Sequence, residues 1–145
     1  MARGETQFHI TGLKEFQREL KRLGDALPGS LRDYNVEAAK RIVDVAKGKA
    51  TRPQQAKAAK SLRASRSASY VAVLLGDSSR YEFALGAEFG SRAYKQFPPW
   101  RGNQWQYWGG GPGYFLHPAI REVGEDVLEE YWDSIRGLAN RAFPD

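Results

Sequence analysis

The chain has 145 residues and carries 22 Lys and Arg against 17 Asp and Glu, so its net charge at pH 7 is +5. Its composition, 41% hydrophobic and 27% charged, is that of a globular protein with one modest core and excludes a disordered chain. The absence of cysteine excludes disulfides, thiolate metal sites and cysteine nucleophiles. Because the sequence has neither an apolar run of about 18 residues nor a signal-peptide pattern, we expect one soluble domain, residues 1–145, made in the cytoplasm without membrane contact.

Two amphipathic helices are predicted in the first third of the chain. Apolar residues recur at helical spacing from Leu13 to Leu27, and Thr11 is a suitable N-cap. We expect Pro28-Gly29 to end this helix and Ser30 to begin a second one. The second helix ends between Gly48 and Pro53. Its apolar stripe consists of Leu31, Tyr34, Ala38, Ile42 and Val45.

The sequence pattern after the second helix predicts mainly strands. Residues 54–60 are either a linker or a short helix. Residues 62–68 alternate between apolar and polar, and residues 70–75 are rich in β-branched and aromatic side chains. Residues 76–79 favour a turn, and the alternation in residues 81–89 predicts a third strand. We therefore expect an antiparallel sheet of about three strands with one face on the helices, because fewer strands are rarely stable alone.

A loop rich in aromatic residues and glycine, residues 91–114, connects this sheet to a final helix. The segment from Tyr94 to Phe115 holds eight of the eighteen aromatic residues of the chain. Such a loop would expose a large apolar area, so we expect a partner to cover it. Pro118 favours the first turn of the last helix. The apolar stripe of that helix consists of Ile120, Val123, Val127, Tyr131, Ile135 and Leu138. The order helix, helix, sheet, loop, helix predicts an α+β fold.

Charge is separated along the chain. From Lys40 to Arg66 there are nine basic residues and one acid, Asp44, whereas residues 117–145 hold seven acids and three arginines. This separation favours contacts between complementary faces of neighbouring copies, although two solvated helix faces explain it equally well. The candidate basic contact face consists of Lys47, Lys49, Arg52, Lys57, Lys60, Arg63 and Arg66.

No catalytic, cofactor or metal site is predicted. The run Gly109–Gly113 lacks the lysine and the spacing of a phosphate-binding loop. The carboxylates of residues 125–130 fit a hydrated helix face better than an acid–base pair. His117 fits a helix-cap or packing role before Pro118 better than a role as ligand or base. We therefore expect a protein that is not an enzyme.

Binding of nucleic acid without sequence preference is an alternative. The basic cluster fits phosphate contacts, and Trp100, Trp105 and Trp108 could stack on bases. However, the basic and aromatic residues lie in different segments, and the sequence contains no RNP-type motif, zinc finger or clear recognition helix.

Two short motifs resemble those of a known protein family. One is Glu88-Phe89-Gly90, and the other is Phe115-Leu116 followed by Pro118. Together they are similar to the strand-end EFG motif and the proline-containing helix start of tail-completion and head–tail joining proteins of long-tailed bacteriophages. Residues 12–16 and 36–49 also resemble the opening of this family, so the resemblance covers nearly the whole chain in order.

The resemblance implies a structural virion protein that forms a six-fold or twelve-fold ring in the neck, between the capsid connector and the tail tube. It implies contacts with further copies, with connector or stopper proteins and with tail terminator or tube proteins, while DNA passes transiently through the ring. A tail terminator, a stopper or a minor tail protein in an adjacent layer fits the same pattern. The protein would be made in the host cytoplasm and function in the virion.

The loop of residues 91–114 is longer and more aromatic than is usual in this family, so we expect it to be an extended interaction segment. Interface hot spots favour Trp and Tyr. The candidate anchors in the subunit interface are Trp100, Trp105, Tyr107 and Trp108. The competing expectation is that these rings fold back on their own subunit, since aromatic side chains are generally buried.

Overall fold

The computed structural model describes residue 18 and residues 27–67, 70–77, 83–102 and 111–142. In chain order its elements are α2 (Leu27–Lys49), α3 (Pro53–Ala59), β1 (Arg63–Ala64), β2 (Val73–Leu74), α4 (Ala84–Phe89) and α5 (Leu116–Ala142). The predicted first helix, residues 13–27, lies outside the described residues except for Arg18, which is helical, and Leu27, which belongs to α2.

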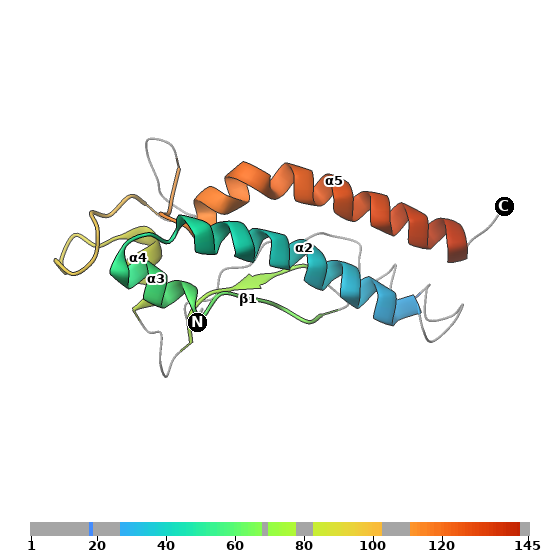
Figure 1. The fold of residues 1–145 in the computed structure, drawn as a ribbon, viewed down its shortest axis with the longest axis horizontal. Coiled ribbons are helices and arrows are strands. Elements are labelled where there is room, and N and C mark those ends of the chain that lie inside the picture. The colour runs from blue at the N-terminus through green and yellow to red at the C-terminus, as the bar shows by residue number, and fades with distance from the viewer. Residues whose placement is uncertain (1–17, 19–26, 68–69, 78–82, 103–110, 143–145) are drawn as a thin grey trace.

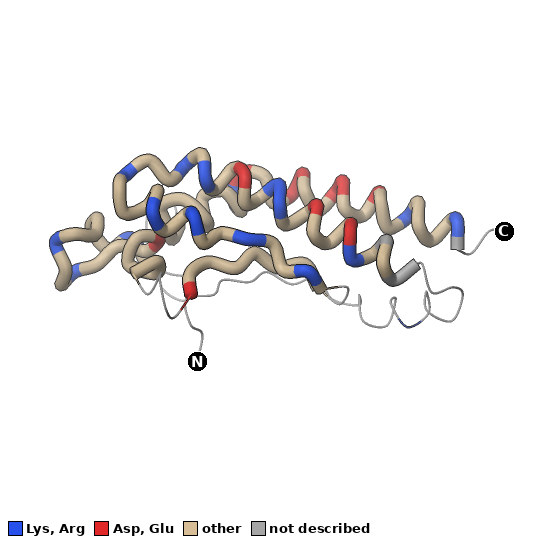
Figure 2. The backbone as a smooth tube through the Cα atoms, turned by 60° about the horizontal axis from the view of Figure 1, so that its bottom comes forward, with Lys and Arg blue, Asp and Glu red and all other residues tan. Residues whose placement is uncertain are grey.

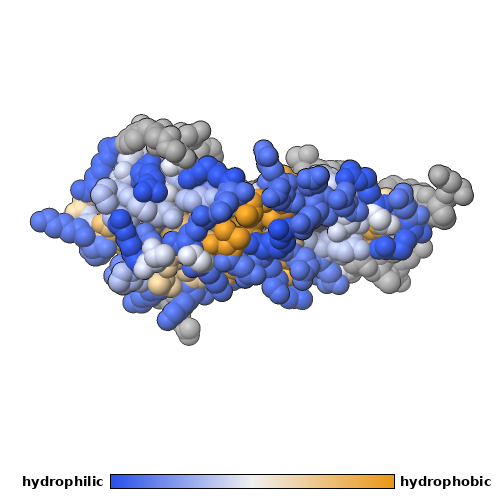
Figure 3. All heavy atoms as spheres, turned by 45° about the horizontal axis from the view of Figure 1, so that its top comes forward, coloured by the Kyte–Doolittle hydropathy of each residue, from blue (hydrophilic) through white to orange (hydrophobic). Residues whose placement is uncertain are grey.

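Two long helices, α2 and α5, run side by side in opposite directions and form the frame of the molecule (Figure 1). Their predicted apolar stripes face each other in the core. Leu31 and Ile42 of α2 are fully buried, as is nearly all of Val127 and Leu138 of α5. The outer sides of the helices carry polar residues, so the face in Figure 3 is mainly hydrophilic, with a hydrophobic area near its middle. Among the described helices, none combines the length and the apolar character that a membrane span requires.

The beginning of α2 differs from the prediction. Pro28-Gly29 does not separate two helices, because α2 starts at Leu27 and contains both residues. Proline is tolerated in a first helical turn, where its missing N–H has no partner to lose. The end of α2 at Lys49 lies within the predicted range.

The segment after α2 forms a short helix, α3, so the helical reading of residues 54–60 is confirmed. Pro53 is the first residue of α3, and Arg52 before it is extended (ψ 152°), as a residue preceding proline prefers. The backbone N–H of Arg52 donates to Oε1 of Gln55 over 3.4 Å, which helps to close the start of the helix.

The sheet is smaller than predicted. In the described residues it has two strands, β1 and β2, which pair antiparallel with Arg63 opposite Leu74 and Ala64 opposite Val73. The predicted third strand, residues 81–89, is wrong, because residues 84–89 form the helix α4. Ala84, Ala87 and Glu88 are buried at helical spacing, and alanine favours a helix. The α+β class is nevertheless confirmed.

A buried polar network connects α5 and α2 to the chain before β2. The hydroxyl of Tyr131 donates to Oδ1 of Asn35 over 2.6 Å. Nδ2 of Asn35 donates to the carbonyl oxygens of Ser67 (2.9 Å) and Tyr70 (3.3 Å). Asn35 is fully buried, so these bonds satisfy its side chain where water is excluded. Burial raises the pKa of Tyr131 far above its ordinary value of 10.0.

Replacing Tyr131 with phenylalanine is expected to lower the free energy of unfolding by about 1–3 kcal/mol, because Oδ1 of Asn35 loses its donor in a buried place. At low pH the hydroxyl of Tyr131 is neutral in both the folded and the unfolded protein. As the pH rises past 10.0, the unfolded chain ionises first, so the Tyr131 contribution is lost with increasing pH. Tyr131→Phe should therefore show a shallower alkaline loss of stability than the unmodified protein in urea titrations. The exposed Tyr94→Phe variant is the control. Parallel alkaline curves for Tyr131→Phe and the unmodified protein would contradict the argument.

Candidate functional site

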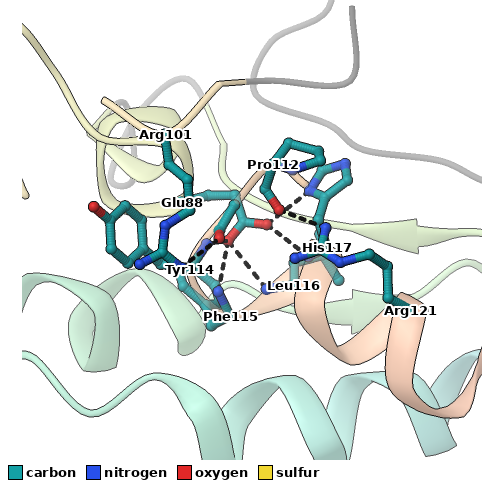
Figure 4. A network of polar contacts seen from close by, with 9 residues as sticks. Glu88, Arg101, Pro112, Tyr114, Phe115, Leu116, His117 and Arg121 are labelled. Carbon is teal, nitrogen blue, oxygen red and sulfur yellow. Dashed lines mark hydrogen bonds and ion pairs between the residues drawn. The ribbon is translucent and has the colours of Figure 1, made fainter. Parts of the chain in front are cut away.

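The two segments that carry the family resemblance meet at the start of α5 (Figure 4). Glu88, in the last turn of α4, is fully buried and directs its carboxylate at the beginning of α5. Its Oε1 accepts hydrogen bonds from the backbone N–H groups of Tyr114 (3.0 Å), Phe115 (2.9 Å) and Leu116 (3.0 Å). Its Oε2 accepts the backbone N–H of His117 (2.7 Å) and lies 2.7 Å from Nδ1 of the same residue.

Glu88 therefore caps α5 from a distant part of the chain. The first N–H groups of a helix have no partner within the helix, and the helix dipole favours a negative charge beside them. A cap usually comes from the residue just before the helix, whereas Glu88 is 28 residues away from Leu116. His117 completes this site: its ring centroid lies 5.0 Å from that of Phe89, and its side chain is 12% exposed. This position fits the predicted cap or packing role of His117.

Two glycines make room for this arrangement. Gly90 follows α4 with φ 85° and ψ −178°, and a Cβ there would overlap the carbonyl group of Pro99. The chain leaves a helix at Gly90, not the strand end that the resemblance implies. Gly113 has φ +84°, and its Cβ would lie 2.6 Å from Oε2 of Glu88. Each glycine therefore permits a close approach that a larger residue would prevent.

The first half of the predicted loop, residues 91–102, folds back on its own subunit. The N–H of Ser91 donates to the carbonyl of Pro98, and the N–H of Arg101 donates to the carbonyl of Phe89, both over 2.9 Å. The ring of Phe97 lies against Gly86, where a Cβ would be 2.6 Å from the ring. Figure 1 shows this segment projecting at the end of the molecule where α3 and α4 lie.

Tyr114, the last residue of the loop, contacts earlier residues of the loop and Arg52, which precedes α3. Its hydroxyl donates to the carbonyl of Pro99 over 2.6 Å. The guanidinium of Arg101 lies 3.9 Å from the centre of the Tyr114 ring, and that of Arg52 lies 5.4 Å from it. Both distances are within the range of cation–π attraction. Sequence reasoning placed Arg52 in the basic face and did not predict this contact.

The structure places one of the four candidate anchors. Trp100 is half-buried, with the guanidinium of Arg92 4.3 Å from its ring centre. Trp105, Tyr107 and Trp108 lie outside the described residues. Trp100 borders an open groove of about 480 Å³ on the loop, and Tyr94 beside it is 64% exposed. Among the loop aromatics that are described, Phe97 and Tyr114 thus pack on their own subunit, as does Phe115 directly after the loop, while Tyr94 faces solvent.

The candidate basic face is brought together on the last turn of α2, on α3 and on β1 with the residues after it. Figure 2 shows these positions in blue along the foreground segments, while red positions recur along α5. The sequence has no acidic residue between Asp44 and Asp77. Within the candidate basic face, Lys49 differs from the other residues because it is half-buried, and its ammonium group pairs with the carboxylate of Glu122 over 2.5 Å. The other six residues are exposed: Lys47, Arg52, Lys57, Lys60, Arg63 and Arg66.

Acidic side chains line the outer side of α5. Three of them are paired within the subunit: Glu122 with Lys49, Glu130 with Arg41, and Asp133 with Arg136. The other three are exposed and have no salt bridge in the described part of the chain: Glu125, Asp126 and Glu129. No three His, Asp or Glu side chains among the described residues come close enough to hold a metal ion.

Comparison with protein-family models, with curated proteins and with solved structures found no match. The features of the chain that bear on its function are the Glu88 cap, the projecting loop and the two charged faces.

Proposed function

We propose that this protein is a structural subunit of a bacteriophage virion, of the tail-completion type, that forms a ring between the capsid connector and the tail tube. The observation that carries this proposal is the cap of α5 by Glu88. The two motifs of the family resemblance begin 27 residues apart, at Glu88 and Phe115, and form one tertiary element in the structure. Phe89 and Phe115 are buried, Gly90 permits the turn, and Pro118 lies in the first turn of α5.

The arrangement of the subunit supports a role in assembly. The paired helices α2 and α5 provide the frame, and the loop projects at one end of the molecule (Figure 1). This loop carries the exposed Tyr94 and the half-buried Trp100. Exposed aromatic residues are typical anchors of protein interfaces. Trp105, Tyr107 and Trp108 belong to the same loop and remain proposed anchors. A terminator, stopper or minor tail protein in a neighbouring layer would use the same features.

A second candidate function is the binding of nucleic acid without sequence preference. The six exposed basic residues on α2, α3 and β1 support it, because phosphate contacts need such a face. Affinity for duplex DNA that falls steeply as salt rises would favour this candidate, whereas a ring protein needs only weak contact with the DNA that passes through it.

The proposal predicts a separation of folding from assembly. Replacing Trp105, Tyr107 and Trp108 with serine should leave the circular dichroism spectrum and the unfolding midpoint nearly unchanged. Ring formation should weaken by more than about a hundredfold, since each hot-spot residue contributes about 2 kcal/mol or more. In a phage that encodes this chain, electron microscopy should show separate heads and tails. The matched control is Trp132→Ser, which removes an exposed ring (38%) from α5 outside the loop.

Two outcomes would count against the proposal in different ways. Normal joining of heads and tails in the triple variant would exclude these residues as anchors. Absence of the chain from purified virions, measured by mass spectrometry, would exclude the virion function itself.

A further inference from the structure

The subunit carries two charged surfaces that its own fold does not neutralise. The basic face is defined here as Lys47, Arg52, Lys57, Lys60, Arg63 and Arg66, and the acidic face as Glu125, Asp126 and Glu129. In the part of the chain that the structure describes, no residue of either face forms a salt bridge. The two faces belong to different elements, since one lies on α3 and its flanks and the other on α5 (Figure 2).

Part of the basic face is held in place by neighbouring groups. Nη1 of Arg63 donates to the carbonyl oxygens of Ser61 (2.8 Å) and Gly76 (3.1 Å). The ammonium group of Lys57 lies 5.2 Å from the centre of the Phe83 ring, and Arg52 lies over the ring of Tyr114. Positioned side chains lose less conformational freedom when a partner binds. These contacts therefore favour a surface that is prepared for a negatively charged partner.

Repulsion between like charges destabilises the acidic face in the isolated subunit. Glu125 and Glu129 are four residues apart on one helix, a spacing at which like charges repel each other. The salt bridges of Arg41 with Glu130 and of Lys49 with Glu122 connect α5 to α2, yet they leave these carboxylates without a partner. A positively charged surface from outside the subunit would relieve this repulsion.

We propose that the basic face of one subunit binds the acidic face of a second copy, head to tail. This inference rests on the proposed function, because it specifies how neighbouring subunits of the ring meet. The two faces are different surfaces, so the contact is heterologous and is repeated from copy to copy until a ring closes. Duplex nucleic acid would neutralise the basic face only and would leave the acidic face without a partner, so a second copy accounts for both surfaces.

Reciprocal charge reversal tests this contact. The basic-reversed variant carries Lys60→Glu and Arg66→Glu, and the acidic-reversed variant carries Glu125→Lys and Glu129→Lys. All four residues are exposed, so both variants should fold. In sedimentation experiments at about 0.1 M salt, where charged groups still interact over about 10 Å, each variant alone should lose self-association by at least tenfold. An equimolar mixture should recover it, because each variant then presents a surface complementary to the other.

The control for the basic-reversed variant is Arg32→Glu with Lys40→Glu, which makes the same change in net charge as that variant on exposed positions of α2 and should leave association unchanged. Self-association of the separate variants at the level of the unmodified protein would overturn the inference, as would a mixture that stays monomeric. An unmodified chain that remains monomeric at about 1 mM would also overturn it, because the affinity would then be negligible.

Binding to a DNA duplex is measured in parallel by fluorescence anisotropy. Loss of DNA binding in the basic-reversed variant with unchanged self-association would assign the basic face to nucleic acid and overturn the contact between copies. All of these measurements use purified protein. Absence of the chain from virions would therefore remove the proposed function while leaving a recovered mixture valid as evidence for the interface.

Discussion

Replacing Glu88 with alanine is expected to lower the free energy of unfolding by roughly 3–5 kcal/mol, because four backbone N–H groups at the start of α5 lose their acceptor. Glu88→Gln should have a smaller effect, about 1–3 kcal/mol. The amide oxygen of the glutamine can still accept the hydrogen bonds that one carboxylate oxygen of Glu88 accepts. The NH₂ group of the glutamine is a donor, however, and it would face a backbone N–H group that also donates. Urea unfolding followed by circular dichroism measures both values.

Hydrogen exchange distinguishes this cap from a general loss of packing. The amide protons of Leu116 and His117 should exchange faster in Glu88→Gln, while those in the middle of α2 should be affected much less. Glu125→Gln is the matched control, because this carboxylate is exposed on the same helix and should change stability by no more than about 0.5 kcal/mol. Stability and exchange in Glu88→Gln equal to those of the unmodified protein would show that the cap contributes little.

Gly90→Ala is expected to destabilise the fold by about 2–4 kcal/mol or to displace the loop that follows. The backbone at Gly90 (φ 85°, ψ −178°) is in a region that residues with a Cβ rarely adopt, and that Cβ would overlap the carbonyl of Pro99. Displacement would break the bonds from Ser91 to Pro98 and from Arg101 to Phe89. Limited proteolysis within residues 91–102 should therefore become faster.

Gly48→Ala, measured in the same way as Gly90→Ala, is expected to raise stability and not to lower it. Gly48 lies in the last turn of α2, and a Cβ there meets nothing within 4 Å. Alanine at this position should stabilise the helix by up to about 1 kcal/mol, because glycine is a weaker helix former. Equal stability and equal proteolysis of Gly90→Ala and the unmodified protein would contradict the role of the positive φ angle.

The long helices could be predicted from the sequence, whereas the short element before the loop could not. Leu31 and Ile42, or Val127 and Leu138, belong to apolar stripes long enough to separate a helical repeat from a strand repeat. The segment of residues 84–89 is too short to distinguish a helical repeat from a strand repeat. Ala84 and Ala87 fit a helical spacing, while the alternation before them fits a strand, and tertiary packing decides between the two.

The candidate site was predictable only in part. The motif around Glu88 identified the residues, yet nothing local indicated that this carboxylate caps a helix, because its acceptor bonds reach residues 26 to 29 positions further along the chain. The partnership of Tyr131 with Asn35 spans 96 positions and was equally out of reach. Spacing patterns report neighbours within a turn or a strand, and such distant hydrogen bonds leave no comparable signal.

The attachment of both ends of the loop has a consequence for how the subunit can vary. Glu88 lies two residues before Gly90 and accepts the backbone N–H groups of residues 114–117, which follow Gly113, so the start of α5 is attached directly to the residue that precedes the loop. Closing a longer segment costs only about 0.6 kcal/mol for each doubling of its length. Insertions and replacements between these two points should therefore alter what the subunit binds while leaving its helical frame intact.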